Sequence, residues 1–354
     1  MSLSGVLPPG SNSISITNRH PTTSSRPIDV KLLEQRTMSL LANGIASSTR
    51  RTYNTAERRF ISFCHQTRQL SPSGYPCPAS EWTLMLFVSH LSESIKAASI
   101  KVYLAGVRSL HIEQGFPNLL ENRLRLPRIV RGVKRLQGSE KRDRCPVTFN
   151  VLQKLQRQVV LTRYNDSMFW AACCLGFFGF LRSGEFTVAS TPSFNPDLHL
   201  GLEDIKMDWH HSPTYMLVKI KASTTDQFRK GVTLRIATSG STICAVRTLS
   251  DYLHLRGNRP GPLFVHADGK PLTRVTLSKW LQETALRAGL AGNFSGHSFR
   301  IGAVTTAAQN GVPDHLIKSL GRWESNAYQL YIKTPPNTLD NVAALLARVN
   351  ATKT

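Results

Sequence analysis

Apolar residues recur at helical spacing along residues 29–137, and this pattern predicts a small helical module. Tyr53, Ala56 and Phe60 illustrate it, because residues three or four positions apart share one face of a helix. In the third predicted helix, Trp82 is expected to face the core. The predicted helices of this module cover residues 30–46, 49–66, 81–92 and 97–114.

The pattern changes after residue 146, where helical runs are joined by short alternating segments. Residues 215–221 and 232–237 alternate apolar and polar side chains, which is typical of strands, and residues 200–205 are expected to form another strand. We therefore expect a mainly α fold with a small β-sheet near the start of this second domain. Its helices are predicted over residues 148–160, 166–180, 244–256 and 276–289.

Residues 294–333 combine two short helices with side chains suited to phosphate chemistry. The first helix is expected to begin at Ser295 or Gly296, which places His297 and Arg300 on one face. By itself, such a pair is more often a surface feature than a catalytic one. The second helix ends just ahead of Gly321, Arg322, Trp323 and, a few residues on, Tyr331.

An upstream motif adds a second candidate arginine. Arg182 directly follows a very apolar run, and a charge in that setting needs a partner. Glu185 could orient it, or a bound phosphate could neutralise it. Arginine grips phosphate oxygens with a planar fork of donors. These residues, together with those of 294–333, could therefore surround one phosphate.

The charge of the chain points to a polyanionic partner. Among 354 residues there are 44 Lys and Arg against 22 Asp and Glu, a net charge of +22. Such an excess most simply indicates nucleic acid, with an anionic membrane surface as the rival. No apolar run approaches the length of a membrane span, and no N-terminal signal pattern is evident. We therefore favour nucleic acid, and not a membrane, as the partner.

The six cysteines form neither a CxxC pair nor a Cys/His spacing typical of a metal site. We expect them to be reduced, mostly buried thiols of an intracellular protein. The sequence thus predicts no metal, no cofactor and no small-molecule ligand.

Composition suggests four segments. Residues 1–28 are rich in Ser, Thr, Pro and Asn and predict a disordered tail. Residues 29–137 form the helical module, residues 138–146 a basic linker, and residues 147–354 the second domain. The most basic stretch runs over residues 123–144, and it suits either a crossing of the phosphate backbone or a nuclear import signal.

Four motifs, taken in order, resemble those of the tyrosine recombinases, also called phage integrases. They are Arg182-x-x-Glu185, His297-x-x-Arg300, Gly321-Arg322-Trp323 and Tyr331. The phrases His-Ser-Phe-Arg-Ile-Gly-Ala and Leu-Gly-Arg-Trp-Glu-Ser-Asn-Ala-Tyr are most similar to the DIRS-like and Crypton-like recombinases of eukaryotic mobile elements. The resemblance covers about residues 30–350. It implies an N-terminal helical core-binding (SAM-like) domain and a mostly helical catalytic domain with a small sheet.

The resemblance also implies a mechanism. Arg182 and Arg300 would neutralise the scissile phosphate, while His297 and Trp323 assist by hydrogen bonds or packing. Tyr331 would be the nucleophile, with Tyr328 as the alternative, and the product a 3′-phosphotyrosine bond. Counting back from Tyr331, the family's His/Trp position falls on Arg322, or on Trp323 with a one-residue shift; we choose Trp323.

The sequence departs from the family at the lysine that protonates the leaving oxygen. This lysine is expected in the hairpin between two strands, but Thr224 occupies its position. Lys221 or Lys230 could replace it. Without a replacement, the protein would be weakly active or inactive.

Cations of the helical module are expected to face DNA, although any one of them could equally belong to a solvated surface. They are Arg50, Arg51, Lys101, Arg108, Arg128, Arg131, Lys134 and Arg135. A last amphipathic helix over residues 340–349 could pack on its own domain or on a neighbouring protomer. Coordinated cutting of two duplexes would require a homotetramer on DNA.

Three functional classes remain open. The first is an active, metal- and ATP-independent recombinase that integrates a mobile element in the nucleus. The second is a domesticated, catalytically impaired DNA-binding descendant, which the departure at Thr224 favours. The third is a strand-swivelling enzyme of the type IB topoisomerase kind, which the wording of residues 294–333 fits less well.

Overall fold

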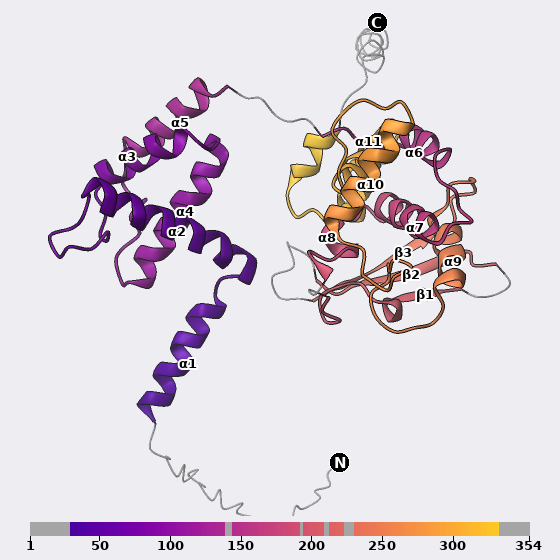
Figure 1. Cartoon of the computed structure of the whole chain (residues 1–354), viewed down its shortest axis with the longest axis horizontal. Coiled ribbons are helices and arrows are strands. Elements are labelled where there is room, and N and C mark those ends of the chain that lie inside the picture. Colours follow the sequence, from indigo (N-terminus) through magenta and orange to yellow (C-terminus); the bar gives the residue numbers. More distant parts are fainter. Residues whose placement is uncertain (1–28, 139–143, 192–193, 209–211, 223–229, 333–354) are drawn as a thin grey trace, which may run out of the picture. The chain divides into compact units, whose positions relative to one another are not determined.

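The chain divides into two compact units, residues 1–139 and 140–354. This division falls inside the segment that the sequence predicts as a linker. We describe each unit by itself, from a computed structural model (Figure 1). The structure describes residues 29–138, 144–191, 194–208, 212–222 and 230–332. The predicted tail over residues 1–28 and the predicted last helix lie outside the described residues.

Helices joined by loops, without a strand, make up the described part of the first unit, as the periodicity predicts. Large apolar side chains with no exposed surface, among them Phe60, Phe87 and Ile100, form its core. Helices α2 and α4 approach closely because Gly106 has no side chain: a Cβ there would lie 2.7 Å from Cβ of Ala56. The helices are α1 (Val30–Asn43), α2 (Ser47–Thr67), α3 (Glu81–Ser92), α4 (Ala97–Glu113) and α5 (Leu126–Leu136).

The inward face of α3 differs from the prediction. Trp82 is 54% exposed, whereas Leu84, Phe87 and Leu91 are buried. This helix is apolar on most of its circumference, so the sequence alone does not define which side faces the core. Contacts with the other helices make that choice.

Helix α5 lies within the basic stretch and is strongly amphipathic. Leu126, Val130 and Val133 pack into the core. The helix is fixed at both ends by side chains from elsewhere. The Glu81 carboxylate accepts hydrogen bonds from the backbone N–H groups of Arg125 and Leu126, at 2.9 and 3.0 Å. The amide group of Gln137 bonds to three backbone groups between α3 and α4.

The second unit is mostly helical with one small sheet (Figure 1). Its described elements are α6 (Phe149–Gln156), α7 (Tyr164–Phe178), α8 (Ser183–Phe186), the 3-10 helix η2 (Leu202–Asp204), β1 (Ile205–Met207), β2 (Tyr215–Ile220), β3 (Val232–Ala237), α9 (Ala245–Arg256), α10 (Arg274–Arg287), α11 (Ser298–Gln309), α12 (Asp314–Gly321) and the 3-10 helix η3 (Asn326–Tyr331).

Helix α7 forms the centre of this unit. Eleven of its residues, from Ser167 to Phe177, are buried, and it contacts α9 and α11. The sheet is antiparallel in the order β1-β2-β3, with Ile205 opposite Val218 and Leu217 opposite Arg235. The mostly helical fold with a small sheet is thus confirmed.

The predicted strand over residues 200–205 is wrong in most of its length. A 3-10 turn, η2, occupies residues 202–204 because the carboxylate of Asp204 accepts a hydrogen bond from the Gly201 N–H at 2.8 Å. The strand itself begins at Ile205. Among the described residues, no helix combines the length and the apolar character needed to cross a membrane.

Candidate active site

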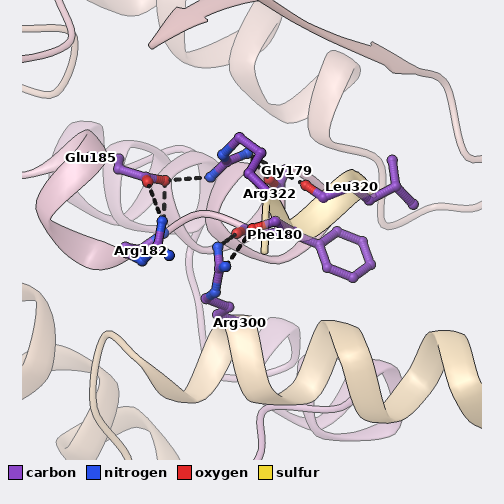
Figure 2. A network of polar contacts seen from close by, with 8 residues as sticks. Gly179, Phe180, Arg182, Glu185, Arg300, Leu320 and Arg322 are labelled. Atoms are coloured by element: carbon purple, nitrogen blue, oxygen red, sulfur yellow. Dashed lines mark hydrogen bonds and ion pairs between the residues drawn. The ribbon is translucent and has the colours of Figure 1, made fainter. Parts of the chain in front are cut away.

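Arg300 is a fully interior arginine, with 1% of its surface exposed. Its Nη1 donates to the backbone carbonyl of Phe180 at 2.6 Å, and its Nη2 donates to the carbonyl of Gly321 (Figure 2). The guanidinium also lies 3.8 Å from the centre of the Trp323 ring. Helix α11 therefore carries an arginine that the ends of α7 and α12 hold in one orientation.

Glu185 links two further arginines (Figure 2). Its Oε1 accepts from Nη1 of Arg182 at 3.1 Å. Its Oε2 accepts from Nη2 of Arg322 at 2.6 Å and from the backbone N–H of Arg182 at 3.0 Å. The Glu185 side chain is 3% exposed, and its two ion pairs offset the cost of burying its negative charge. The expectation that Glu185 orients Arg182 agrees with this geometry.

His297 lies beside the candidate nucleophile. Its Nε2 is 3.3 Å from the hydroxyl oxygen of Tyr331, and the two rings meet edge to face. Burial, and then the positive charges of Arg144, Arg300 and Arg182, lower the pKa of His297 to about 4. The imidazole is therefore neutral at pH 7 and can accept a proton at the nitrogen that bears none.

Arg300 stays cationic at neutral pH despite its burial. Burial, and then the charge of Arg182, lower the pKa of Arg300. Glu185 opposes this change, and the resulting pKa is about 9. The charge of Arg322 lowers the pKa of Arg300 as well, so all the charged groups of this cluster affect Arg300. The site thus gathers several cations in a place from which water is largely excluded.

Two glycines allow this convergence. A Cβ at Gly296 would lie 2.5 Å from Cβ of Ser183, so Gly296 lets the His297 segment approach the turn that carries Arg182. A Cβ at Gly302 would lie 1.8 Å from the carbonyl oxygen of Val147, so α11 can lie directly against the start of the unit. Helix α11 begins at Ser298, with His297 as its N-cap, two or three residues after the predicted start.

Trp323 and Arg322 have different partners. The Trp323 ring packs against Arg300 and lies 6.2 Å from the ring of Tyr331. Arg322 turns away to Glu185. The choice of Trp323 as the neighbour of the nucleophile therefore fits the geometry. Arg322 contributes to the site through its ion pair with Glu185.

Tyr331 is better placed than Tyr328 to act as a nucleophile. Tyr328 is 4% exposed, and its hydroxyl donates to Asp314 at 3.4 Å. Tyr331 is partly exposed and its hydroxyl faces His297. The Tyr331 carbonyl accepts a hydrogen bond from Thr305 at 3.0 Å, which fixes its backbone to α11.

Lys221 has other partners. Its Nζ lies 2.7 Å from Oδ2 of Asp204 and 2.9 Å from Oε1 of Glu203. Burial lowers the pKa of Lys221, but the hydrogen bonds that Lys221 donates to these two carboxylates outweigh burial and raise it. A lysine held in this way is a poor proton donor, so the structure gives no support to Lys221 as the leaving-group acid. Thr224 lies outside the described residues, and Lys230 is an exposed residue before β3.

Two site residues were not among the predicted set. Arg144 forms a backbone bridge with Asn293, and its charge acts on His297. Arg322 pairs with Glu185. Arg322 stands nine residues before Tyr331, which is the family's spacing for the His/Trp position, but that role was predicted for Trp323.

The predicted DNA-binding cations belong to the first unit. Arg51, Lys101, Arg108, Arg128, Arg131, Lys134 and Arg135 are exposed. Arg50 is partly buried and pairs with Glu113 at 3.1 Å. Within the described residues, no group of three His, Cys, Asp or Glu side chains is placed to hold a metal ion.

Comparisons with known proteins agree with this geometry. Residues 203–334 match the profile of the Phage integrase family. The integrase/recombinase xerD homolog of Selenomonas ruminantium is 26% identical over 257 residues, which are 66% of this chain and 67% of the relative. Over these residues the chain is thus similar to the phage integrases, also called tyrosine recombinases.

Two solved structures share the fold. One is the XerH site-specific recombinase bound to palindromic difH substrate in a post-cleavage complex, with a TM-score of 0.60, 16% identity, and coverage of 84% of this chain and 79% of that one. The other is a lambda integrase dimer bound to a COC′ core site, with a TM-score of 0.55, 17% identity, and coverage of 86% and 77%.

Proposed function

We propose that this protein cuts and rejoins DNA strands through a 3′-phosphotyrosine intermediate, as the site-specific recombinase of a mobile element. The observation that carries the proposal is the contact between the Tyr331 hydroxyl and His297, beside the buried guanidinium of Arg300. A nucleophile, a neutral base and fixed cations are the parts that transfer of a phosphodiester requires.

The first step is attack on phosphorus. His297 accepts the proton of the Tyr331 hydroxyl, and the phenolic oxygen forms a bond to phosphorus. Arg182 and Arg300 offer donors to the non-bridging oxygens, where negative charge increases as the five-coordinate transition state forms. Loss of one such donor typically costs about 100- to 1,000-fold in rate.

The second step is departure of the 5′-oxygen, which leaves with the electrons of the broken P–O bond and gains a proton. One phosphate ester replaces another, so the phosphodiester energy is retained and strand rejoining needs no ATP. Attack of the free 5′-hydroxyl on the phosphotyrosine reverses the two steps and restores Tyr331.

The charge of the first unit supports DNA as the substrate. Exposed Arg and Lys side chains line α5 on the side opposite its buried Leu126, Val130 and Val133. Phosphate contacts of this kind supply affinity without sequence preference. A homotetramer on DNA, action in the nucleus, and a DIRS-like or Crypton-like origin belong to the same proposal. A lambda integrase tetramer bound to a Holliday junction is among the structures with this fold, at a TM-score of 0.55.

One observation favours a second candidate, a DNA-binding protein with impaired chemistry. Lys221 is engaged by Asp204 and Glu203, so it is not available as the leaving-group acid in this arrangement. Lys230, on the other side of the same hairpin, is the remaining candidate from the sequence.

Covalent trapping on DNA distinguishes the two. Because the target site is unknown, the protein is incubated with a pool of nicked random-sequence duplexes, denatured, and extracted so that only protein-linked DNA is recovered. We expect adducts from the wild type and from Tyr328→Phe, and none from Tyr331→Phe. Sequencing of the recovered DNA identifies the site, which then serves as a defined substrate.

On that substrate, Lys221→Ala is compared with Lys230→Ala. Slower cleavage by Lys230→Ala alone identifies the leaving-group acid. If the wild type binds DNA in a salt-sensitive manner but the pool yields no adduct, the non-catalytic function replaces the recombinase.

A further inference from the structure

Arg322 and Arg182 both form ion pairs with the Glu185 carboxylate. The shorter of the two ion pairs of Glu185 is the one to Arg322, 2.6 Å against 3.1 Å for Arg182. Both pairs are largely enclosed, with 14% and 20% of the two arginine side chains exposed. The Arg182 side chain therefore donates to one oxygen of Glu185 and the Arg322 side chain to the other. Some N–H groups of the Arg182 guanidinium remain available to another anion.

The backbone holds Arg322 in this role. Arg322 is the C-cap of α12 and adopts a left-handed conformation, with φ 56° and ψ 49°. This position favours glycine, and a residue with a Cβ is disfavoured there. The guanidinium also donates weakly to the carbonyls of Gly179 and Leu320 (Figure 2). An arginine at a position suited to glycine suggests that its side chain has a use.

The charges of this cluster suggest that use. Three guanidinium cations, of Arg182, Arg300 and Arg322, are set against the single carboxylate of Glu185, which leaves a net charge of two positive units. A phosphodiester carries one negative charge. When a phenolate attacks, the phosphoryl group acquires a second negative charge until the leaving oxygen is protonated. The cluster thus matches the transition state better than the bound substrate.

We infer that Arg322 is a positioning residue, an inference that rests on the proposed function and deepens it. Arg322 holds Glu185 and so keeps Arg182 available for the scissile phosphate. It also sets the net charge of the site to suit the transition state. Without Arg322, both oxygens of Glu185 can close on Arg182. The cluster then keeps one positive unit instead of two, so it stabilises the doubly charged transition state less than the wild-type cluster does.

Charge-restoring variants test this role. Arg322→Gln removes one positive unit, and the double variant Glu185→Gln/Arg322→Gln removes a cation and an anion together and restores the net charge of two. In single-turnover cleavage at saturating DNA, we expect Arg322→Gln to be about 10- to 100-fold slower with DNA affinity within about threefold of wild type. The double variant should cleave at least about tenfold faster than Arg322→Gln.

Two controls separate this role from a loss of folding. Arg322→Gly removes the same ion pair but suits the left-handed conformation, so it should be more heat-stable than Arg322→Gln yet show the same slow cleavage. Arg157→Gln changes the same charge at the C-cap of α6, where the side chain is exposed, and should cleave at the wild-type rate. Cleavage by Arg322→Gln within threefold of wild type, or no recovery in the double variant, overturns the inference.

A second readout needs no DNA cleavage. Sulfate is a dianion, and its binding is followed through the increase in thermal unfolding temperature of the full chain, against sodium chloride of equal ionic strength. We expect weaker stabilisation by sulfate in Arg322→Gln and recovery in the double variant. If the wild type forms no DNA adduct but sulfate shows this pattern, the proposed function fails while the role of Arg322 stands; equal stabilisation of all variants removes that role.

Discussion

Gly321 occupies a position where one methyl group would collide with an active-site ring. A Cβ there would lie 1.3 Å from Cζ3 of Trp323. Gly321→Ala must displace Trp323 and, with it, the surface on which Arg300 rests. We expect the free energy of unfolding of the second unit to fall by about 1–3 kcal/mol in urea denaturation.

Gly132→Ala is the matched control for that substitution. Gly132 lies within α5, and a Cβ there would meet no atom within 4 Å. Alanine in a helix is favoured over glycine by about 0.5–1 kcal/mol, so this change should stabilise the first unit. A neutral Gly321→Ala would mean that Trp323 has room to move.

His297 gives a pH dependence of defined sign. Its pKa is lowered to about 4 by burial first and then by Arg144, Arg300 and Arg182. A histidine in the unfolded chain titrates at about 6.5. Between these values the unfolded state binds a proton that the folded state does not, so stability falls as the pH falls from about 6.5 to about 4.

The size of this effect is about 1–2 kcal/mol after allowance for the partial exposure of the ring. Urea denaturation at several pH values checks it by comparing wild type with His297→Gln. The variant should lose less stability over this window, since His111, His199 and His266, whose pKa values are also lowered, remain in both proteins. Identical pH profiles would contradict the assignment.

The structure brings most of the predicted site residues together, but the sequence did not predict how each is held. Arg182, His297, Arg300 and Tyr331 were selected by their order and spacing along the chain. Spacing could not decide between Arg322 and Trp323. The left-handed backbone at Arg322 directs the two neighbouring side chains to different partners, and such a conformation has no simple signature in an arginine.

At the scale of elements, helices were predicted better than their ends. The predicted range 81–92 agrees with α3, and the predicted range 232–237 with β3. The start of α11 was predicted at Ser295 or Gly296 but lies at Ser298, because the Ser298 hydroxyl accepts a hydrogen bond from the Ser295 N–H at 3.0 Å and turns the chain before the helix begins. Helix caps depend on such local contacts, which periodicity does not contain.

Gln137 fixes the end of α5 to the segment between α3 and α4. Its Nε2 donates to the carbonyls of Ser92 and Ile95, at 3.0 and 2.9 Å, and its Oε1 accepts from the Ala97 N–H at 2.9 Å. Gln137→Ala removes all three bonds. We expect a loss of about 1–3 kcal/mol in the free energy of unfolding of the first unit, by urea denaturation.

Gln153→Ala serves as the comparison, because Gln153 is an exposed residue of α6. Surface substitutions of this kind usually change stability by less than about 0.5 kcal/mol. A loss at Gln137 no larger than that at Gln153 would show that α5 is held by its apolar face alone.

At the scale of the whole molecule, the net charge of +22 makes DNA binding dependent on salt. Each phosphate contact contributes a slope of about −0.9 to the logarithm of affinity against the logarithm of salt concentration. Replacement of Arg128, Arg131, Lys134 and Arg135 by glutamine should therefore reduce the slope by about 3 to 4, measured by fluorescence anisotropy on duplex DNA.

The same experiment on Lys154→Gln/Arg157→Gln, two exposed changes on α6, measures the effect of lost charge away from α5. If this pair reduces the slope as much per residue as the α5 variant does, the α5 surface has no special part in binding. Cleavage of DNA already bound should be unaffected by either set, since these residues lie outside the cluster around Arg300.

The hydrogen bond from Thr305 to the Tyr331 carbonyl holds the candidate nucleophile against the helix that carries Arg300. Thr305 and Arg300 belong to the same helix, so the tyrosine and the arginine that it serves come from one polypeptide. For the proposed reaction we therefore predict cutting in cis, in which a defective subunit gains no tyrosine from its neighbour. A mixture of Tyr331→Phe and Arg300→Gln proteins should therefore form no adduct on the defined substrate, whereas an exchange of tyrosines between subunits would restore it.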